Sequence, residues 1–475
     1  MATPTTQPSN AVPALSAERE VNWPKREKSK LANGLEIILV ESHSIPRFHG
    51  ELFFRTGNAA FSDRSPGLAG MAATMVRTGT AKRASRQIEE DLRALGADLS
   101  TSAGQDTSAI AFAGLSEFAE PLLGLVNELA REASFPSAEL ERERRQKLEE
   151  VRLERTQPGF LAGERLRKVL FGEHPYAKIS PSEKEVAAYK REELQAIYRQ
   201  SYTPENALLL LVGDFEPAAM LGTIEKIFAP WSGGKPVLPQ TAAPAGPRGR
   251  RVYLVHVPGA VQTQILCGCH AITRKHADWI KLGLANSLYG GAFNSRLVMN
   301  IREAKGYTYS PRSAVNALQQ HGYFSVSAAV RNEVVAASLT EVFYEIDKLR
   351  SLPVPEAELA DAQNYLSGVF SMGLATQDGL LSQVATVALN DLPDNYLETY
   401  RDKVRTLTPD DLQSAAQKYF DSANMQIAVV GDRGRIETQA ALWRPGSFRR
   451  ARASLVVSPA GAPYYGIRER SSKTG

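Results

Sequence analysis

Two stretches of this chain repeat each other at a nearly constant distance along the sequence. Residues 192–214 (EELQAIYRQSYTPENALLLLVGD) align without gaps on residues 410–432 (DDLQSAAQKYFDSANMQIAVVGD), an offset of 218. A second match joins PSAEL at 136–140 to PEAEL at 355–359, an offset of 219. Two independent matches at nearly one offset indicate an internal duplication. We therefore expect the chain to contain two copies of one module.

A segment rich in Pro, Gly and Ala separates the two copies. This segment, residues 232–250, is interpreted as a linker between a first domain at 25–231 and a second domain at 251–446. The start of the chain, residues 1–24, is rich in Pro, Ser and Thr and is expected to be a disordered arm. Residues 447–475 form a basic C-terminal tail, which we interpret as solvated.

Each copy has the pattern of strands in hairpins beside amphipathic helices. GLEIILVESHSI follows the turn dipeptide Asn33-Gly34, and RFHGELFFRTG continues it as a second strand. SRQIEEDLRALGA predicts an amphipathic helix that ends at Gly96, and ALLLLVGD is typical of a buried strand. Hairpins beside helices, rather than strict strand–helix alternation, predict an α+β fold in which antiparallel-rich sheets pack against helices.

Composition excludes several classes of function. A net charge of +4 over 475 residues gives no concentrated basic face for nucleic acid. No run approaches 18 apolar residues, so no membrane span is expected. The start lacks the charged and apolar regions of a signal peptide, which favours the cytoplasm as written, or the periplasm if an upstream leader is missing.

The cysteines and histidines do not predict a metal centre. On a strand, Cys267 and Cys269 share one face while His270 points to the other, and this geometry does not close a tetrahedral site. A buried strand of the second domain is the favoured interpretation, and the two thiols imply no oxidising compartment. The other histidines are expected to be isolated packing or surface residues: His43, His49, His174, His256 and His321.

The stretch SPGLAGMAATM, residues 65–75, predicts a short helix with few chemical groups. Ser65 has the side chain of an N-cap, and Pro66 suits the first helical position. One apolar stripe is expected to face the core, consisting of Leu68, Met71, Ala72 and Met75. The opposite face offers only Gly70, Ala73 and Thr74.

The strongest local signal is GGAFNSRLVMNIREAKGYTYSPRS, residues 290–313. We expect a short helix that carries Arg302, a break at Gly306 and then a strand that carries Tyr309, so that the two side chains converge. A guanidinium fork and a phenol suit an electron-rich oxygen, such as a peptide carbonyl that becomes an oxyanion. Removing one such donor typically costs roughly 3–4 kcal/mol in the transition state. The alternative is a surface Arg–Glu pair beside a core tyrosine.

Together these features resemble the M16 metallopeptidases, the pitrilysin-type inverzincins that include the mitochondrial processing peptidases and bacterial relatives. The resemblance is carried by the GG-F-SRL…REAKG-TYS run, the duplicated halves, LANGLEIILVE, HPY at 174–176 and the two VGD strands. It spans about residues 25–446 and implies two homologous α+β domains. In this family two such units close around an unfolded peptide, and an arginine and a tyrosine seven residues apart help to hold the substrate carbonyl opposite the zinc. The matching residues here are Arg302 and Tyr309.

The chain departs from the family at the zinc motif His-x-x-Glu-His. The frame GLAGMAATM places Gly70 and Thr74 at the two histidine positions and Ala73 at the position of the general base. The third family ligand matches Glu150, which is present. Catalytic zinc needs three protein ligands and a water, and a lone carboxylate cannot supply the roughly 10–16 kcal/mol typical of a tight site. We therefore expect no cofactor in this chain and expect Glu150 to pair with Lys147.

The resemblance implies a zinc-free subunit of a heterodimeric M16 peptidase. Such a subunit would supply Arg302 and Tyr309 to a partner with an intact His-x-x-Glu-His, which would carry the zinc, and the shared substrate would be an unfolded peptide. This chain is not expected to hydrolyse peptides alone. The alternative is a catalytically inactive subunit that binds peptides or forms a structural core. A self-sufficient zinc peptidase is contradicted by the lost motif.

Overall fold

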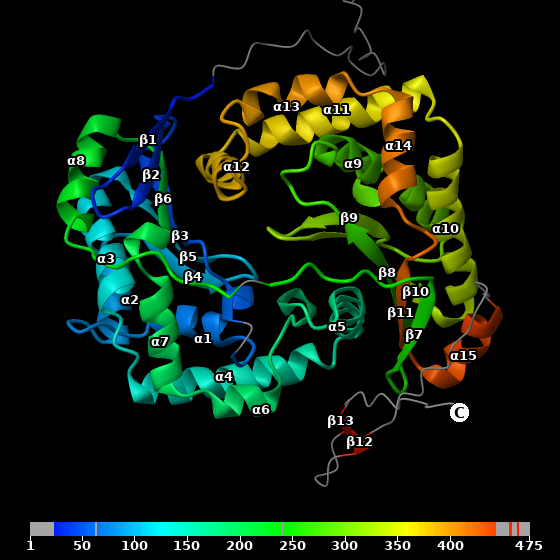
Figure 1. Ribbon diagram of the computed structural model, residues 1–475, viewed down its shortest axis with the longest axis horizontal. Coiled ribbons are helices and arrows are strands. Elements are labelled where there is room, and N and C mark those ends of the chain that lie inside the picture. The colour runs from blue at the N-terminus through cyan, green and yellow to red at the C-terminus, as the bar shows by residue number, and fades with distance from the viewer. Residues whose placement is uncertain (1–22, 62–63, 240, 443–455, 458–462, 465–475) are drawn as a thin grey trace, which may run out of the picture.

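The computed structural model describes residues 23–61, 64–239, 241–442, 456–457 and 463–464. Most of the expected N-terminal arm lies outside the described residues. So does the basic tail, apart from the two paired strands β12 (Val456–Val457) and β13 (Pro463–Tyr464). In Figure 1 two groups of helices and strands lie on either side of the centre, one from each half of the chain.

The first half builds a six-stranded mixed sheet in the order β1-β2-β6-β3-β5-β4. Its strands are β1 (Arg26–Lys30), β2 (Glu36–Glu41), β3 (Arg47–Phe54), β4 (Asp98–Ala103), β5 (Ser108–Leu115) and β6 (Ala207–Gly213). Every residue of β6 is buried, as the apolar run ALLLLVG predicts for a central strand. One face packs on α1 (Leu68–Val76), α2 (Ser85–Ala94), α3 (Ala119–Glu132), α7 (Arg191–Ser201) and α8 (Pro217–Phe228).

The second half builds a five-stranded mixed sheet in the order β7-β11-β8-β10-β9. Its strands are β7 (Arg251–His256), β8 (Gln262–Ala271), β9 (Arg312–Ala317), β10 (Gly322–Arg331) and β11 (Gln426–Gly431). Its main core includes residues of α9 (Trp279–Asn286), α10 (Val335–Ser351), α11 (Glu356–Gly373), α13 (Tyr396–Arg405), α14 (Pro409–Tyr419) and α15 (Arg433–Leu442).

The two sheets share one topology. When β2, β6, β3, β5 and β4 are matched in turn to β7, β11, β8, β10 and β9, the strand orders coincide, and the parallel pairs β2–β6 and β7–β11 correspond. The repeated stretches at 192–214 and 410–432 contain α7 with β6 and α14 with β11. The structure therefore confirms the duplication and the α+β fold class.

The two halves exchange one helix each across their junction. From the first half, α5 (Pro158–Phe171) packs on β8 and β11 of the second sheet. From the second half, α12 (Gln377–Leu389) packs on β6 and β3 of the first sheet. In Figure 1, α12 lies beside the first sheet and α5 beside the second. These exchanged helices bury the remaining sheet faces and fix how the two halves are arranged.

Candidate functional site

The helix at the family's metal position begins later than the sequence predicts. The sequence predicts Ser65 as the cap, but α1 begins at Leu68, and its N-cap is Gly67, with a left-handed φ of 78° and no side-chain cap. A Cβ at Gly67 would lie 2.7 Å from the hydroxyl oxygen of Tyr189, which donates to the carbonyl of Pro66. This close approach and the positive φ select glycine, and they displace the helix start from the Ser-Pro pair.

The buried face of α1 forms as predicted, but its exposed face contains fewer residues than predicted. The expected apolar stripe is buried in the first core, and Ala73 is buried as well, with 1% of its surface exposed. Gly70 donates its backbone N–H to Oδ1 of Asn58 at 3.3 Å. Thr74 donates its hydroxyl to the carbonyl of Gly70 at 3.2 Å. The groups at the metal positions therefore satisfy local hydrogen bonds.

A cavity of about 470 Å³ lies against this helix. Gly70 and Thr74 contribute to one part of its lining, and Gln146, Lys147 and Glu150 of α4 (Ser137–Glu154) contribute to another. Residues 101–103 of the edge strand β4 also line it. The structure thus brings the predicted Gly70, Thr74 and Glu150 to one polar cavity.

The donors around this cavity do not fit a catalytic zinc. Glu150 is paired at both oxygens, with Lys147 Nζ at 3.1 Å and with the Gln146 side-chain amide at 3.3 Å. The expected Glu150–Lys147 pair is therefore confirmed. The positions of the two family histidines hold a glycine and a threonine, so two of the three ligands that zinc needs are missing. Within the described ranges, no group of three His, Cys, Asp or Glu side chains could hold a metal ion.

Arg302 and Tyr309 meet on the surface of the second half. Arg302 lies on a π-helical segment, Val298–Ala304, and its Cζ is 4.7 Å from the ring centre of Tyr309. The expected convergence is confirmed, but the expected strand at Tyr309 is wrong. Only Thr308 forms an isolated bridge, to Val330, and β9 begins at Arg312.

The alternative interpretation, a surface Arg–Glu pair beside a core tyrosine, is wrong for the tyrosine. Arg302 does form an ion pair, since its Nε lies 3.0 Å from Oε1 of Glu303. Tyr309, however, is 80% exposed and belongs to no core. An exposed phenol beside a guanidinium is available to a bound oxygen, which a core tyrosine would not be.

The two cysteines pack as predicted, inside a strand. Cys267 and Cys269 lie on β8 in the second core, are not bonded to each other, and are fully buried by their sheet and helices. Burial raises the pKa of each thiol to about 12. A protonated, buried thiol is neither a metal ligand nor a nucleophile.

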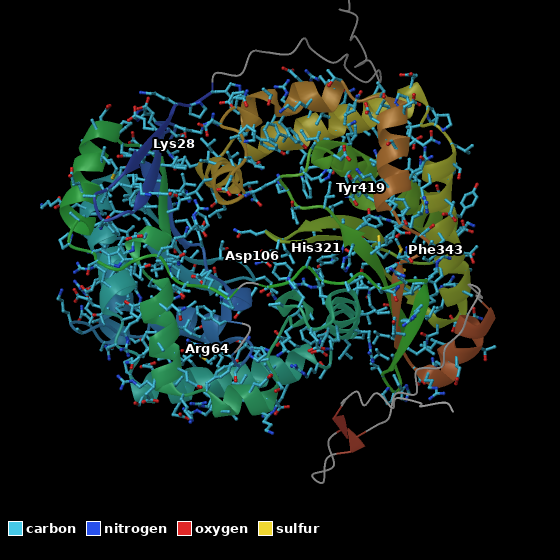
Figure 2. All side chains as sticks on the ribbon, in the orientation of Figure 1. Lys28, Arg64, Asp106, His321, Phe343 and Tyr419 are labelled. Carbon is cyan, nitrogen blue, oxygen red and sulfur yellow. The ribbon has the colours of Figure 1, made fainter. Side chains whose placement is uncertain are left out.

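The prediction that five histidines are isolated is wrong for two of them, His174 and His321. Together with His270, they gather around the ring of Phe171 at the junction of the halves. Figure 2 labels His321 and Asp106 in this central region. Asp106 accepts the backbone N–H of Gln319 at 3.0 Å, which ties the β9–β10 turn to the first half. The sequence offers only the HPY motif at 174–176 near this cluster, and nothing local shows that helix α5, which ends at Phe171, packs on the second sheet.

Comparisons with known proteins agree with this architecture. Residues 37–179 match the family model described as insulinase (peptidase family M16), and residues 188–366 match the model described as peptidase M16 inactive domain. The second match begins ahead of the expected linker at 232–250.

Curated relatives include an uncharacterized zinc protease of Mycobacterium tuberculosis, 23% identical over 75% of this chain and 81% of that protein. Another, from Streptomyces coelicolor, is 21% identical over 85% of this chain and 89% of its own length. Both are similar to the chain over most of their length.

Solved structures extend the likeness. A peptidase M16 inactive domain from Pseudomonas fluorescens has a TM-score of 0.80 and 26% identity, covering 86% of this chain and 98% of its own. A protease from Helicobacter pylori has a TM-score of 0.78 at 19% identity, covering 86% of this chain and all of its own, and shows the shared fold alone. Within the described residues, no helix is long and apolar enough to cross a membrane. From its two family matches and its duplicated fold, the chain belongs to peptidase family M16.

Proposed function

We propose that this chain is the zinc-free subunit of a heterodimeric M16 metallopeptidase. The observation that carries the proposal is an asymmetry between two sites. The zinc positions have lost their ligands, with Gly70, Ala73 and Thr74 in their place, whereas Arg302 and Tyr309 remain together and accessible. Loss of function by drift would be expected to erode both sites alike.

In this role the pair supplies hydrogen-bond donors to a peptide carbonyl. The ion pair with Glu303 engages Nε of Arg302, so the outer edge with Nη1 and Nη2 is the edge we assign to the substrate oxygen. Tyr309 adds one directional O–H donor. Zinc and the general base would come from the partner chain, which would carry the intact His-x-x-Glu-His.

The test is reconstitution with an M16 chain from the same organism that carries the intact zinc motif. We expect the mixture to cleave fluorescein-labelled casein, an unfolded protein, far faster than either chain alone. Arg302→Ala should lower this activity by about 10²-fold, the typical cost of one oxyanion donor, and Tyr309→Phe should also lower it. Arg433→Ala is the matched control, since Arg433 pairs with Glu437 on the distant helix α15. Full activity of both site variants would refute the proposal.

A second candidate is a subunit that binds peptide without taking part in cleavage. The cavity beside the edge strand β4 favours it, because an extended peptide can add to an open sheet edge through main-chain hydrogen bonds. The same mixture distinguishes the two functions. Binding of labelled casein without faster cleavage supports the second candidate and not the first.

A further inference from the structure

A third side chain meets the Arg302–Tyr309 pair. The ring centre of Phe293 lies 4.8 Å from Cζ of Arg302, close to the 4.7 Å that separates Cζ from the Tyr309 ring. Both distances are within cation–π range. Phe293 is 63% exposed, so its ring is not held there by a core. The guanidinium therefore has two aromatic neighbours and one carboxylate, Glu303.

The loop that carries Phe293 is held against the start of β9. A Cβ at Gly290 would lie 2.7 Å from Oγ of Ser313, and a Cβ at Gly291 would lie 2.6 Å from the side-chain nitrogen of Asn286. Ser313 in turn donates its hydroxyl to Oδ1 of Asn286 at 2.8 Å. The Gly-Gly pair thus permits a close approach that any side chain would prevent. The position of Phe293 follows from this anchored turn.

The segments that carry Arg302 and Tyr309 are anchored independently. Asn300, on the same π-helical segment as Arg302, donates to Glu341 at 3.0 Å and to Glu345 at 2.7 Å on α10. Beside Tyr309, Thr308 donates its hydroxyl to the carbonyl of Ala329 at 2.6 Å. Three separate anchors therefore bring the phenyl ring, the guanidinium and the phenol to one place on the surface.

We propose that Phe293 is a positioning residue, which together with Glu303 holds the Arg302 guanidinium in the orientation that meets a peptide carbonyl. This inference rests on the proposed function and names a residue that acts through Arg302. An arginine side chain has several rotatable bonds, and an unsupported guanidinium would pay their entropy when it binds an oxygen. A ring on one side and a carboxylate at Nε reduce that cost before the substrate arrives.

The experiment compares Phe293→Ala with Phe293→Tyr in the reconstituted complex, with labelled casein as the probe. A cation–π contact at an exposed site corresponds to about two- to fivefold in an equilibrium constant, so Phe293→Ala should lower kcat/KM about fivefold. The loss should fall on kcat, because the contact orients a donor for the transition state. Phe293→Tyr keeps a ring and should restore most of the activity.

A double-variant cycle separates positioning from general damage. If Phe293 acts through Arg302, the double variant Phe293→Ala/Arg302→Ala should be no slower than Arg302→Ala alone. Additive losses would overturn the inference, as would unchanged activity of Phe293→Ala. Neither result would affect the proposed function, which is tested separately by reconstitution of cleavage and by the Arg302→Ala and Tyr309→Phe variants.

An NMR measurement and a control variant distinguish loss of the Phe293–Arg302 contact from misfolding. The Arg302 Nε–H NMR signal of the isolated chain should shift in Phe293→Ala, because the ring current at the guanidinium is lost, and an unmoved signal would overturn the contact. Tyr344→Ala is the matched control, since Tyr344 is a 54% exposed ring on α10 with Lys348 5.8 Å from its centre. It should leave both the NMR signal and the cleavage rate unchanged.

Discussion

Nε2 of His321 lies 2.8 Å from Nδ1 of His270, and Nε2 of His270 lies 2.7 Å from the carbonyl oxygen of Leu170. A carbonyl only accepts, so Nε2 of His270 carries the hydrogen, and its Nδ1 accepts from His321 in the neutral rings. This chain of bonds joins the second sheet to the end of the exchanged helix α5. Protonation of His270 would replace its acceptor at Nδ1 with a donor, so the bond donated by His321 requires a neutral His270.

This geometry predicts that the contribution of the three histidines to stability is lost in mild acid. Burial lowers the pKa of His174, His270 and His321, and the neighbouring histidines lower that of His321 further. Among the charged neighbours of His174, Asp106 raises its pKa and Arg167 lowers it. A histidine in the unfolded chain has a pKa of about 6.5. Below this pH, the unfolded chain binds protons that the folded chain does not. The free energy of unfolding contributed by these groups is therefore present above that pH and falls as the pH drops from 7 to 5.

Urea unfolding at several pH values between 5 and 8 measures this effect. His321→Gln, which keeps a side-chain donor, should make the acid loss smaller than in the wild type. His43→Gln is a control of opposite sign, because the hydrogen bond to Asp214 raises the pKa of His43. Removing that histidine should lower stability more in acid than at pH 8. An unchanged pH profile in His321→Gln would contradict the assignment.

The buried carboxyl of Glu51 should make stability depend on pH in the opposite direction. It lies on β3, and burial, helped by Asp378 on α12, raises its pKa to about 7. The folded chain therefore binds a proton between about pH 4.5 and 7 that the unfolded chain has lost, so stability falls as the pH rises through this range. Glu51→Gln should match the wild type at pH 5 and exceed it at pH 8 by roughly 1–3 kcal/mol. The exposed Glu41→Gln serves as control, and an equal gain at both pH values would rule out ionisation as the cause.

Phe171 is predicted to couple the two halves. Its ring is 2% exposed at the end of α5 and contacts the rings of Tyr176 in the first half and Tyr323 in the second. Phe171→Ala should cost about 3–5 kcal/mol. Because the ring is shared, amide hydrogen exchange should accelerate on both sides of the junction. Phe420→Ala, whose ring stacks on Phe324 at 4.2 Å inside the second core, should accelerate exchange in the second half alone.

The sequence predicted those features that local periodicity and repetition encode. The repeat at 192–214 and 410–432 predicted two equivalent modules, and the structure confirms them as two sheets of one topology. The sequence could not predict that α5 and α12 are exchanged between the halves, because an amphipathic helix has the same pattern whichever sheet it covers. The histidine cluster was missed for a related reason. His270 and His321 are separated by 51 residues, and only the exchanged packing of α5 brings Leu170 to them.

Within the candidate site, side chains were predicted better than backbone. Spacing correctly placed Arg302 beside Tyr309 and Glu150 beside Lys147. The predicted cap at Ser65 was wrong because Tyr189 packs against Gly67, a contact with a distant helix end that local preference cannot contain. The strand predicted at Tyr309 was wrong because only Thr308 pairs with β10.

The position that matches the family's metal site should bind zinc when two histidines are introduced there. A Cβ at Gly70 would have no atom nearer than Asn58 Oδ1 at 4.0 Å, so a side chain fits there. Gly70→His/Thr74→His would place two imidazoles at i and i+4 on one helix face, beside Glu150 across the same cavity. We expect this variant to bind about one zinc per chain, measured by metal analysis after dialysis, because Glu150 completes three ligands. Adding Glu150→Gln to this variant should abolish tight zinc binding. Equal zinc content in the two variants would show that Glu150 is not a ligand and that the cavity does not have the geometry of the family's metal site. The two-histidine variant should still cleave no casein alone, because Ala73 supplies no general base.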